Sequence, residues 1–213
     1  MKKLLIALFA ITSVTALAET HVYGKLGADV YARYNKIEAD FGKFSTSGTT
    51  HGLSGMLEVT TDVSPNLELG AGIGYIHRSS GKSKGNGTYS WKTPKYDTAP
   101  LYALAKYNFD TKENWKPYAK VDLGIAFNDS SSTLEFDWEV KENKLDVQNG
   151  VYAGAGIGVE YHNFLAELSY HITTAKAKGA FAYDMGTEKK TTNFNGDYNN
   201  HAITLSAGYK FNF

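Results

Sequence analysis

The sequence predicts an all-β protein, a single eight-stranded antiparallel up-and-down β-barrel whose lumen is filled by side chains. Three observations predict this fold: the composition, an apolar–polar alternation along the chain, and connections of two distinct lengths. Tyr (15) and Gly (21) are abundant among the 213 residues, whereas Pro (4) is scarce. This composition favours strands over helices.

The charge balance and the missing cysteine exclude several classes of function. Lys plus Arg and Asp plus Glu both total 22, so the chain lacks the basic surplus of a general nucleic-acid binder. Without cysteine there can be no disulfide framework, thiolate zinc site or thiol nucleophile.

The N-terminus has the three parts of a secretory signal peptide. Lys2 and Lys3 precede an apolar run from 4 to 10, and an Ala-Leu-Ala cleavage pattern ends at position 18. The apolar run is too short to span a bilayer as a helix. We therefore expect residues 1–18 to be a signal peptide and residues 19–213 to form the barrel domain.

Eight later segments alternate with a period of two, as half-buried strands do. Each has about the length that a tilted strand needs to cross a bilayer. The segments are 22–34, 53–63, 67–76, 101–109, 118–127, 151–161, 164–172 and 203–213.

The connections between these segments alternate between short and long. Short turns are expected at 64–66, 110–117 and 162–163, and long polar loops at 35–50, 80–98, 129–148 and 177–200. Short turns at one end and long loops at the other are typical of an outer-membrane barrel.

The position of the glycines decides which face meets lipid. A soluble barrel such as a lipocalin also alternates, but its apolar face points inward. Here Gly72 and Gly158 lie on the polar face, and hairpin pairing would set them opposite Glu58 and Glu167. Glycines suit a crowded interior and weaken a solvent-facing strand. The polar face is therefore expected inside, with the apolar face and aromatic girdles, Tyr34 among them, toward lipid.

The same alternation predicts a network of charged side chains in the lumen. With six Lys or Arg against seven Asp or Glu, we expect paired charges that fill a narrow barrel. A narrow, porin-like diffusion channel is the alternative. The predicted lumen charges are Lys25, Asp29, Arg33, Glu58, Glu68, Arg78, Lys120, Asp122, Glu160 and Glu167, with Asp62, Lys106 and Lys210 beside them. Inward tyrosines are expected at Tyr23, Tyr31, Tyr102, Tyr118 and Tyr152.

The last strand alternates apolar residues and ends in phenylalanine, with Tyr209, Phe211 and Phe213 on one face. Together with the signal peptide and the eight strands, this pattern resembles the small eight-stranded bacterial outer-membrane β-barrels, which include the OmpA barrel, OmpX and Ail, and the opacity-type proteins. The resemblance implies a place in the cell outer membrane, contact with outer-membrane lipids and lipopolysaccharide, and recognition of the terminal aromatics by the barrel assembly machinery. The peptidoglycan-binding domain of full-length OmpA is not matched.

The long loops carry the residues expected to contact partners. Lys82, Lys84, Trp91 and Lys95 form a basic, aromatic group in the second loop, and Trp138 lies in an acidic third loop. Either loop could bind a host or cell-surface ligand, and the basic one could bind lipopolysaccharide phosphates. In a further interpretation the two loops only pack on each other. We expect a structural and surface-recognition role, of the adhesion type.

Enzymatic signals are weak, and we expect neither catalysis, nor a cofactor, nor a metal. His77 and Ser79 share a strand face and resemble a pair of the lipid A deacylase family, but the sequence identifies no acidic partner. A lipid A-modifying enzyme therefore remains an alternative only. The glycine repeat at 70–74 lacks the helix that a dinucleotide loop needs. The six histidines show no metal-ligand spacing on one element.

Overall fold

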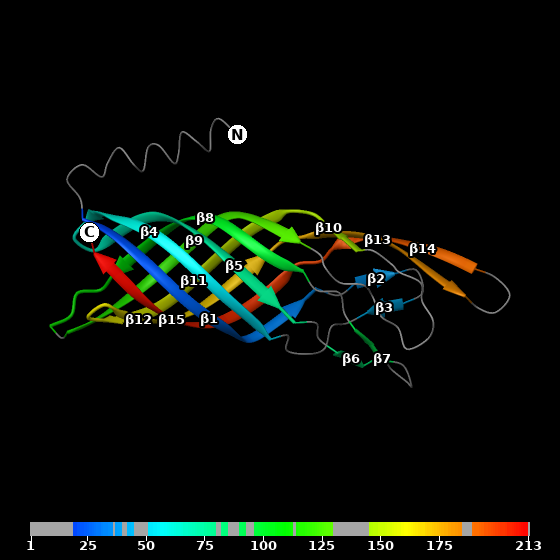
Figure 1. Ribbon diagram of the computed structural model, residues 1–213, viewed down its shortest axis with the longest axis horizontal. Helices are drawn as coiled ribbons and strands as arrows, with labels where there is room; N and C mark the ends of the chain where they lie inside the picture. Colours follow the sequence, from blue (N-terminus) through cyan, green and yellow to red (C-terminus); the bar gives the residue numbers. More distant parts are fainter. Residues whose placement is uncertain are drawn as a thin grey trace, which may run out of the picture.

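The structure, a computed structural model, is a closed barrel with short sheets at one of its ends (Figure 1). In the part of the chain that it describes, no helix is long and apolar enough to span a membrane. The described residues are 19–35, 37–39, 42–44, 51–79, 82–84, 90–92, 96–112, 114–129, 145–184 and 189–212.

Eight strands close the barrel in the order β1-β15-β12-β11-β9-β8-β5-β4, and every pair is antiparallel. The predicted number of strands and the up-and-down topology are confirmed. The barrel strands are β1 (Thr20–Tyr34), β4 (Gly52–Ser64), β5 (Leu67–Arg78), β8 (Asp97–Asn108), β9 (Trp115–Asp129), β11 (Gly150–Tyr161), β12 (Phe164–Thr173) and β15 (Asn200–Asn212).

Three short connections lie at the same end of the barrel as the start of β1 and the end of β15 (Figure 1). We call this the short-turn end and the opposite one the long-loop end. The β11–β12 turn is the tightest, and His162 adopts a left-handed φ of 55° there. The β8–β9 connection is shorter than predicted, because β9 already begins at Trp115.

The long-loop end carries more strands than the sequence analysis expected. The segment 177–200, predicted as a loop, instead contains the hairpin of β13 (Lys176–Asp184) and β14 (Lys189–Asp197). Backbone bonds continue from the barrel into this hairpin, as from the Tyr198 amide to the Ala175 carbonyl at 2.8 Å. Three further short elements complete this end: β10 (Leu145–Val147), which pairs with β13, and the hairpins β2 (Ile37–Ala39)–β3 (Gly42–Phe44) and β6 (Lys82–Lys84)–β7 (Ser90–Lys92).

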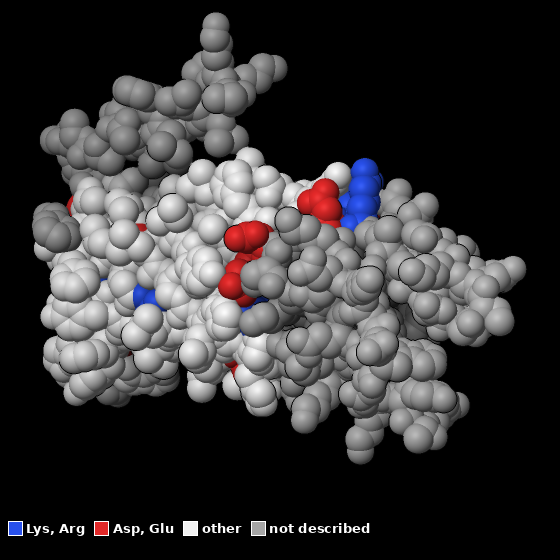
Figure 2. All heavy atoms as spheres, turned by 45° about the vertical axis from the view of Figure 1, so that its right-hand side comes forward, with Lys and Arg blue, Asp and Glu red and all other residues white. Residues whose placement is uncertain are grey.

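The two faces of the wall are oriented as predicted. Leu57, Ile73 and Leu205 point outward with 50%, 56% and 53% of their surface exposed. Glu58 and Lys120 point inward and are only 3% and 4% exposed. On the side shown in Figure 2 the described wall is mostly uncharged, with charged atoms visible in a few places only. The barrel is therefore apolar outside and polar inside, the reverse of a soluble barrel.

One β-bulge corrects the prediction at the end of β1. Between Asp29 and Tyr31 the pairing with β15 skips Val30, so an extra residue reverses the side-chain alternation that follows. Arg33 and Tyr31, predicted inside, are exposed on the outer wall. Tyr34, predicted in an outer girdle, is buried inside.

Candidate functional site

The lumen brings together charged side chains from all eight barrel strands. Of the ten residues predicted for the charge network, all but Arg33 are buried within the barrel, whereas Asp62 and Lys210, predicted beside them, are partly exposed. The buried residues are Lys25, Asp29, Glu58, Glu68, Arg78, Lys120, Asp122, Glu160 and Glu167. Their contacts divide them into three clusters along the barrel axis.

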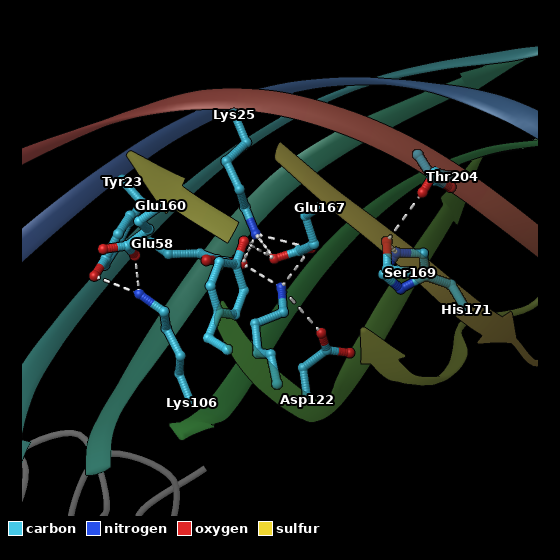
Figure 3. A network of polar contacts seen from close by, with 12 residues as sticks. Tyr23, Lys25, Glu58, Lys106, Asp122, Glu160, Glu167, Ser169, His171 and Thr204 are labelled. Carbon is cyan, nitrogen blue, oxygen red and sulfur yellow. Dashed lines mark hydrogen bonds and ion pairs between the residues drawn. The ribbon is translucent and has the colours of Figure 1, made fainter. Parts of the chain in front are cut away.

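The middle cluster joins two lysines to three carboxylates (Figure 3). Glu58 is the shared acceptor, with its Oε1 at 2.7 Å from Lys25 Nζ and 2.8 Å from Lys120 Nζ. Each lysine also lies 3.3 Å from Glu167, and Lys120 lies 3.4 Å from Asp122. These charges come from four different strands, so the cluster connects opposite sides of the barrel.

Two glycine–tyrosine pairs make room for this cluster. Glu58 faces Gly72 and Glu167 faces Gly158, as predicted from the hairpin registers. The space above each glycine is taken by a tyrosine, however, and not by the carboxylate. A Cβ added to Gly72 would collide with the ring of Tyr102, its neighbour on β8. A Cβ added to Gly158 would collide with the ring of Tyr118, its neighbour on β9.

The hydroxyls of Tyr102 and Tyr118 form hydrogen bonds with the two carboxylates that face the glycines, Glu58 and Glu167. Tyr102 donates to Glu58 at 2.8 Å, and Tyr118 donates to Glu167 at 3.0 Å. Glycine thus positions a ring, and the ring in turn completes the hydrogen bonds of a buried charge.

The second cluster lies toward the short-turn end. Lys106 forms ion pairs with Glu68 and Glu160, and it donates to the Tyr23 hydroxyl at 2.8 Å. Tyr23 in turn donates to Glu68 at 2.8 Å. Lys210 lies 3.7 Å from Glu160 and is partly exposed, so this cluster borders the opening of the barrel.

The third cluster lies toward the long-loop end. Arg78 Nε is 3.8 Å from Asp29 Oδ2, and an Arg78 guanidinium N–H donates to the Thr98 hydroxyl at 3.3 Å. The second Asp29 oxygen accepts from Thr204 at 2.7 Å. His171 lies between this cluster and the middle one, bonded to the Tyr152 hydroxyl at 2.7 Å.

Three tyrosines that the sequence analysis did not group together close the long-loop end. Tyr34 stacks on Tyr198 with ring centroids 4.7 Å apart, and Tyr96 meets both rings edge-on. Burial raises the pKa of Tyr96 and of Tyr198 above the ordinary tyrosine value, which already keeps the hydroxyl protonated at physiological pH. Tyr96 and Tyr198 lie in predicted loops, where the period-two pattern gives no signal.

Around the middle cluster the described residues leave little free volume. A cavity beside Lys25, Lys120 and Tyr152 holds about 10 Å³, roughly enough for one water molecule. At the short-turn end an open cavity of about 380 Å³ reaches Glu68 and Glu160. In the described part of the barrel, paired side chains therefore fill the lumen around the middle cluster.

The predicted rim pair, His77 and Ser79, is not assembled as a nucleophile and base. The Ser79 hydroxyl donates to the His51 carbonyl at 2.8 Å. His77 does have an acidic partner that the sequence did not identify, since its Nδ1 lies 3.0 Å from Asp97 Oδ2. Tyr75 donates to the same oxygen at 2.8 Å, so these contacts form an outward-facing polar group.

The predicted loop contacts are only partly described. Lys82 and Lys84 lie on β6, and Trp91 pairs with Ser83 across the β6–β7 hairpin. Lys95 and Trp138 lie outside the described residues.

Aromatic side chains gather on the outer wall near the short-turn end. Tyr209 packs edge-on against Phe164 and Phe211, and Tyr107 packs against Phe109. All five are exposed, as interface anchors of a membrane barrel are. Phe213, predicted as part of the terminal assembly signal, lies outside the described residues.

Comparisons with known proteins agree with this architecture. The family model described as outer membrane protein beta-barrel domain matches residues 6–211. A Pasteurella multocida (strain Pm70) protein, PM1543, is 31% identical over 240 residues, covering 99% of this chain and 98% of that protein.

Similar solved structures are small outer-membrane barrels. OprG from Pseudomonas aeruginosa has a TM-score of 0.50 at 15% identity, covering 91% of this chain and 96% of OprG. Neisserial surface protein A has a TM-score of 0.45 at 15% identity, with 90% and 97% of the two chains covered. The chain therefore belongs to the outer-membrane protein β-barrel family and lies in the cell outer membrane.

Proposed function

We propose that the protein is a structural outer-membrane barrel that does not conduct and that presents a recognition surface, of the adhesion type, at the cell surface. The filled lumen carries this proposal. Three clusters of paired charges and the tyrosines at the long-loop end occupy the interior of the described barrel. By the usual orientation of such barrels, the short turns are periplasmic and the long loops extracellular.

The extracellular strands supply the recognition surface. β10, β13 and β14 form a sheet that projects beyond the barrel (Figure 1). The β6–β7 hairpin adds Lys82, Lys84 and Trp91 at the same end. Binding residues are commonly carried by connections that a rigid scaffold positions, and here the filled barrel is that scaffold.

Single-channel recording in a planar bilayer tests the closed lumen. The purified protein should produce no stable conductance steps, because paired side chains fill its interior. A variant in which Tyr102 and Tyr152 are both alanine serves as the control, since it removes two of the largest inward rings. Large stable steps from the unaltered protein would contradict the proposal and favour the porin-like diffusion channel.

Replacing residues 176–197 by a short turn tests the recognition surface. The loop-shortened barrel should still reach the outer membrane and show heat-dependent gel migration, since the hairpin lies outside the closed barrel. Adhesion to cultured epithelial cells should fall at least fivefold for bacteria that display this variant. Equal adhesion of the two strains would refute a recognition role for this hairpin.

Lipopolysaccharide is the second partner that we propose. Arg33 lies on the outer wall at the extracellular end of β1, directly opposite His201 in the sheet. Tyr170 lies beside them, bonded through its hydroxyl to His201 Nδ1 at 2.8 Å. A guanidinium on the outer wall at the extracellular end of the barrel would pair with lipopolysaccharide phosphates.

We further propose that the barrel assembly machinery recognises the last strand. Tyr209 and Phe211 are exposed on the outer wall of β15, and Phe213 continues their alternation in the sequence. Removal of residues 1–18 as a signal peptide belongs to the same proposal, because export precedes assembly.

The lipid A-modifying alternative has one direct test. Since Ser79 donates to a carbonyl and not to His77, the geometry does not favour it. Replacing Ser79 with alanine should leave the acylation pattern of lipid A unchanged in mass spectra. A loss of deacylated lipid A in that variant would instead support the enzyme.

A further inference from the structure

Three potential metal ligands meet at the periplasmic opening of the barrel. Glu19 precedes β1, His21 lies on β1, and Asp62 lies on the neighbouring strand β4. One donor atom from each side chain lies within 4.8 Å of the other two. The group borders the open cavity of about 380 Å³, so a solute in the periplasm can reach it.

The surroundings of His21 point to a cation. Its ring is almost fully buried, with Nδ1 at 3.1 Å from Asn212 Oδ1 and Nε2 at 3.4 Å from Asp62 Oδ1. Both neighbours are hydrogen-bond acceptors, so one ring nitrogen can donate to Asn212 while the other can bind a metal ion beside Asp62. If Nδ1 donates to Asn212, the Nε2 lone pair faces the Asp62 carboxylate oxygen. A cation between Nε2 and this oxygen would bind both atoms.

The separation of these two atoms suits a shared metal ion. Two ligands on a tetrahedral zinc with bonds of about 2.0–2.1 Å lie about 3.4 Å apart. A metal-binding histidine usually donates its other ring N–H to an oxygen acceptor, which fixes the ring. Asn212, which pairs with His21 across β1 and β15, is placed to be that acceptor.

The cavity also favours cations electrostatically. Its lining contains five carboxylates but only two lysines. Glu68 and Glu160 are already paired with lysines in the barrel interior. The acidic side chains at the His21 end of the cavity are therefore the ones that attract an external cation.

We propose that Glu19, His21 and Asp62 bind a divalent transition-metal ion, with zinc the best fit to one nitrogen and two oxygen ligands. Water from the cavity completes the coordination. The bound ion ties the start of β1 to β4, beside the seam at which β1 and β15 close the barrel. Because Asp62 on β4 is distant in sequence from Glu19 and His21, no spacing on a single element reveals the group in the sequence.

Calorimetric titration of the mature protein (residues 19–213), purified from outer membranes and stripped with a chelator, tests the site. Zinc chloride should bind with one ion per barrel, and His21→Ala and Asp62→Asn should each weaken binding at least tenfold. His162→Ala is the matched control, because His162 borders the same cavity but lies outside the ligand group. Its affinity should match that of the unaltered protein.

Two further measurements separate metal binding from a folding defect. Glu19→Gln alters an exposed side chain before β1, so the variant should fold and still lose zinc affinity at least tenfold. Cobalt should give the intense visible bands of a tetrahedral site in the unaltered protein and in His162→Ala, and these bands should be lost in His21→Ala and Asp62→Asn. The proposal is overturned if zinc does not bind, or if it binds equally to the His21→Ala and His162→Ala variants.

Discussion

Lys120 lies within ion-pair distance of Glu58, Asp122 and Glu167, at 2.8, 3.4 and 3.3 Å. Lys25 is the only other cation in contact with this group among the described residues. Taking charges out of water is costly unless they are paired. The stability of the middle of the lumen therefore depends on a single ammonium group more than on any one carboxylate.

Replacing Lys120 with methionine should destabilise the barrel by about 3–5 kcal/mol, because three buried carboxylates would share one lysine. Urea titration of the barrel in detergent, followed by tryptophan fluorescence, measures the change. Lys116→Met is the matched control, since it makes the same replacement at an exposed position of β9 and should change stability by less than about 0.5 kcal/mol. Equal losses in the two variants would contradict the role of Lys120.

Gly72 and Gly24 provide a second pair of matched positions. Gly72→Ala should cost about 1–3 kcal/mol, because the new methyl group would overlap the Tyr102 ring inside the barrel. Gly24→Ala should be neutral or slightly stabilising, since no atom lies within 4 Å of the added Cβ. The same urea titration compares them, and a larger loss at Gly24 would show that the inner wall is not crowded at Gly72.

At the scale of the strand, the alternation predicts which face is buried until a bulge interrupts it. The pattern places the β4–β5 and β11–β12 registers correctly, since Glu58 faces Gly72 and Glu167 faces Gly158. The prediction fails after Asp29, because the bulge inserts one extra residue into the strand and no residue type in the sequence marks it. The sequence therefore predicts Arg33 in the lumen, whereas the structure places it on the outer wall of the barrel.

The chain contains no cysteine, so single cysteines can report which way each side chain of β1 points. Arg33→Cys should react rapidly with a water-soluble maleimide in the detergent-solubilised barrel. Ala32→Cys, at a neighbouring residue that is fully buried, should react at least tenfold more slowly. The reverse order of rates would show that the β1 bulge is absent.

For the whole molecule, the sequence predicts the fold better than the sites. The eight alternating segments and the connections of two lengths are distributed over the whole chain, so one local irregularity does not obscure the pattern. The sites depend on contacts between strands that are distant in sequence. The stacking of Tyr34 on Tyr198 and the approach of His21 to Asp62 are examples, and neither leaves a local pattern.

The wall of the barrel turns its apolar side chains toward lipid and encloses the charged ones. Fluorophores attached to single cysteines at Leu57, Ile73 and Leu205, in vesicles containing brominated lipids, measure this orientation. These outward positions should label readily and be quenched by the bromine. Cysteines at the buried serines Ser54, Ser169 and Ser206 should resist labelling, and any fluorophore that attaches should escape quenching. Strong quenching at the serine positions, with none at the three apolar positions, would show that the wall has the opposite orientation.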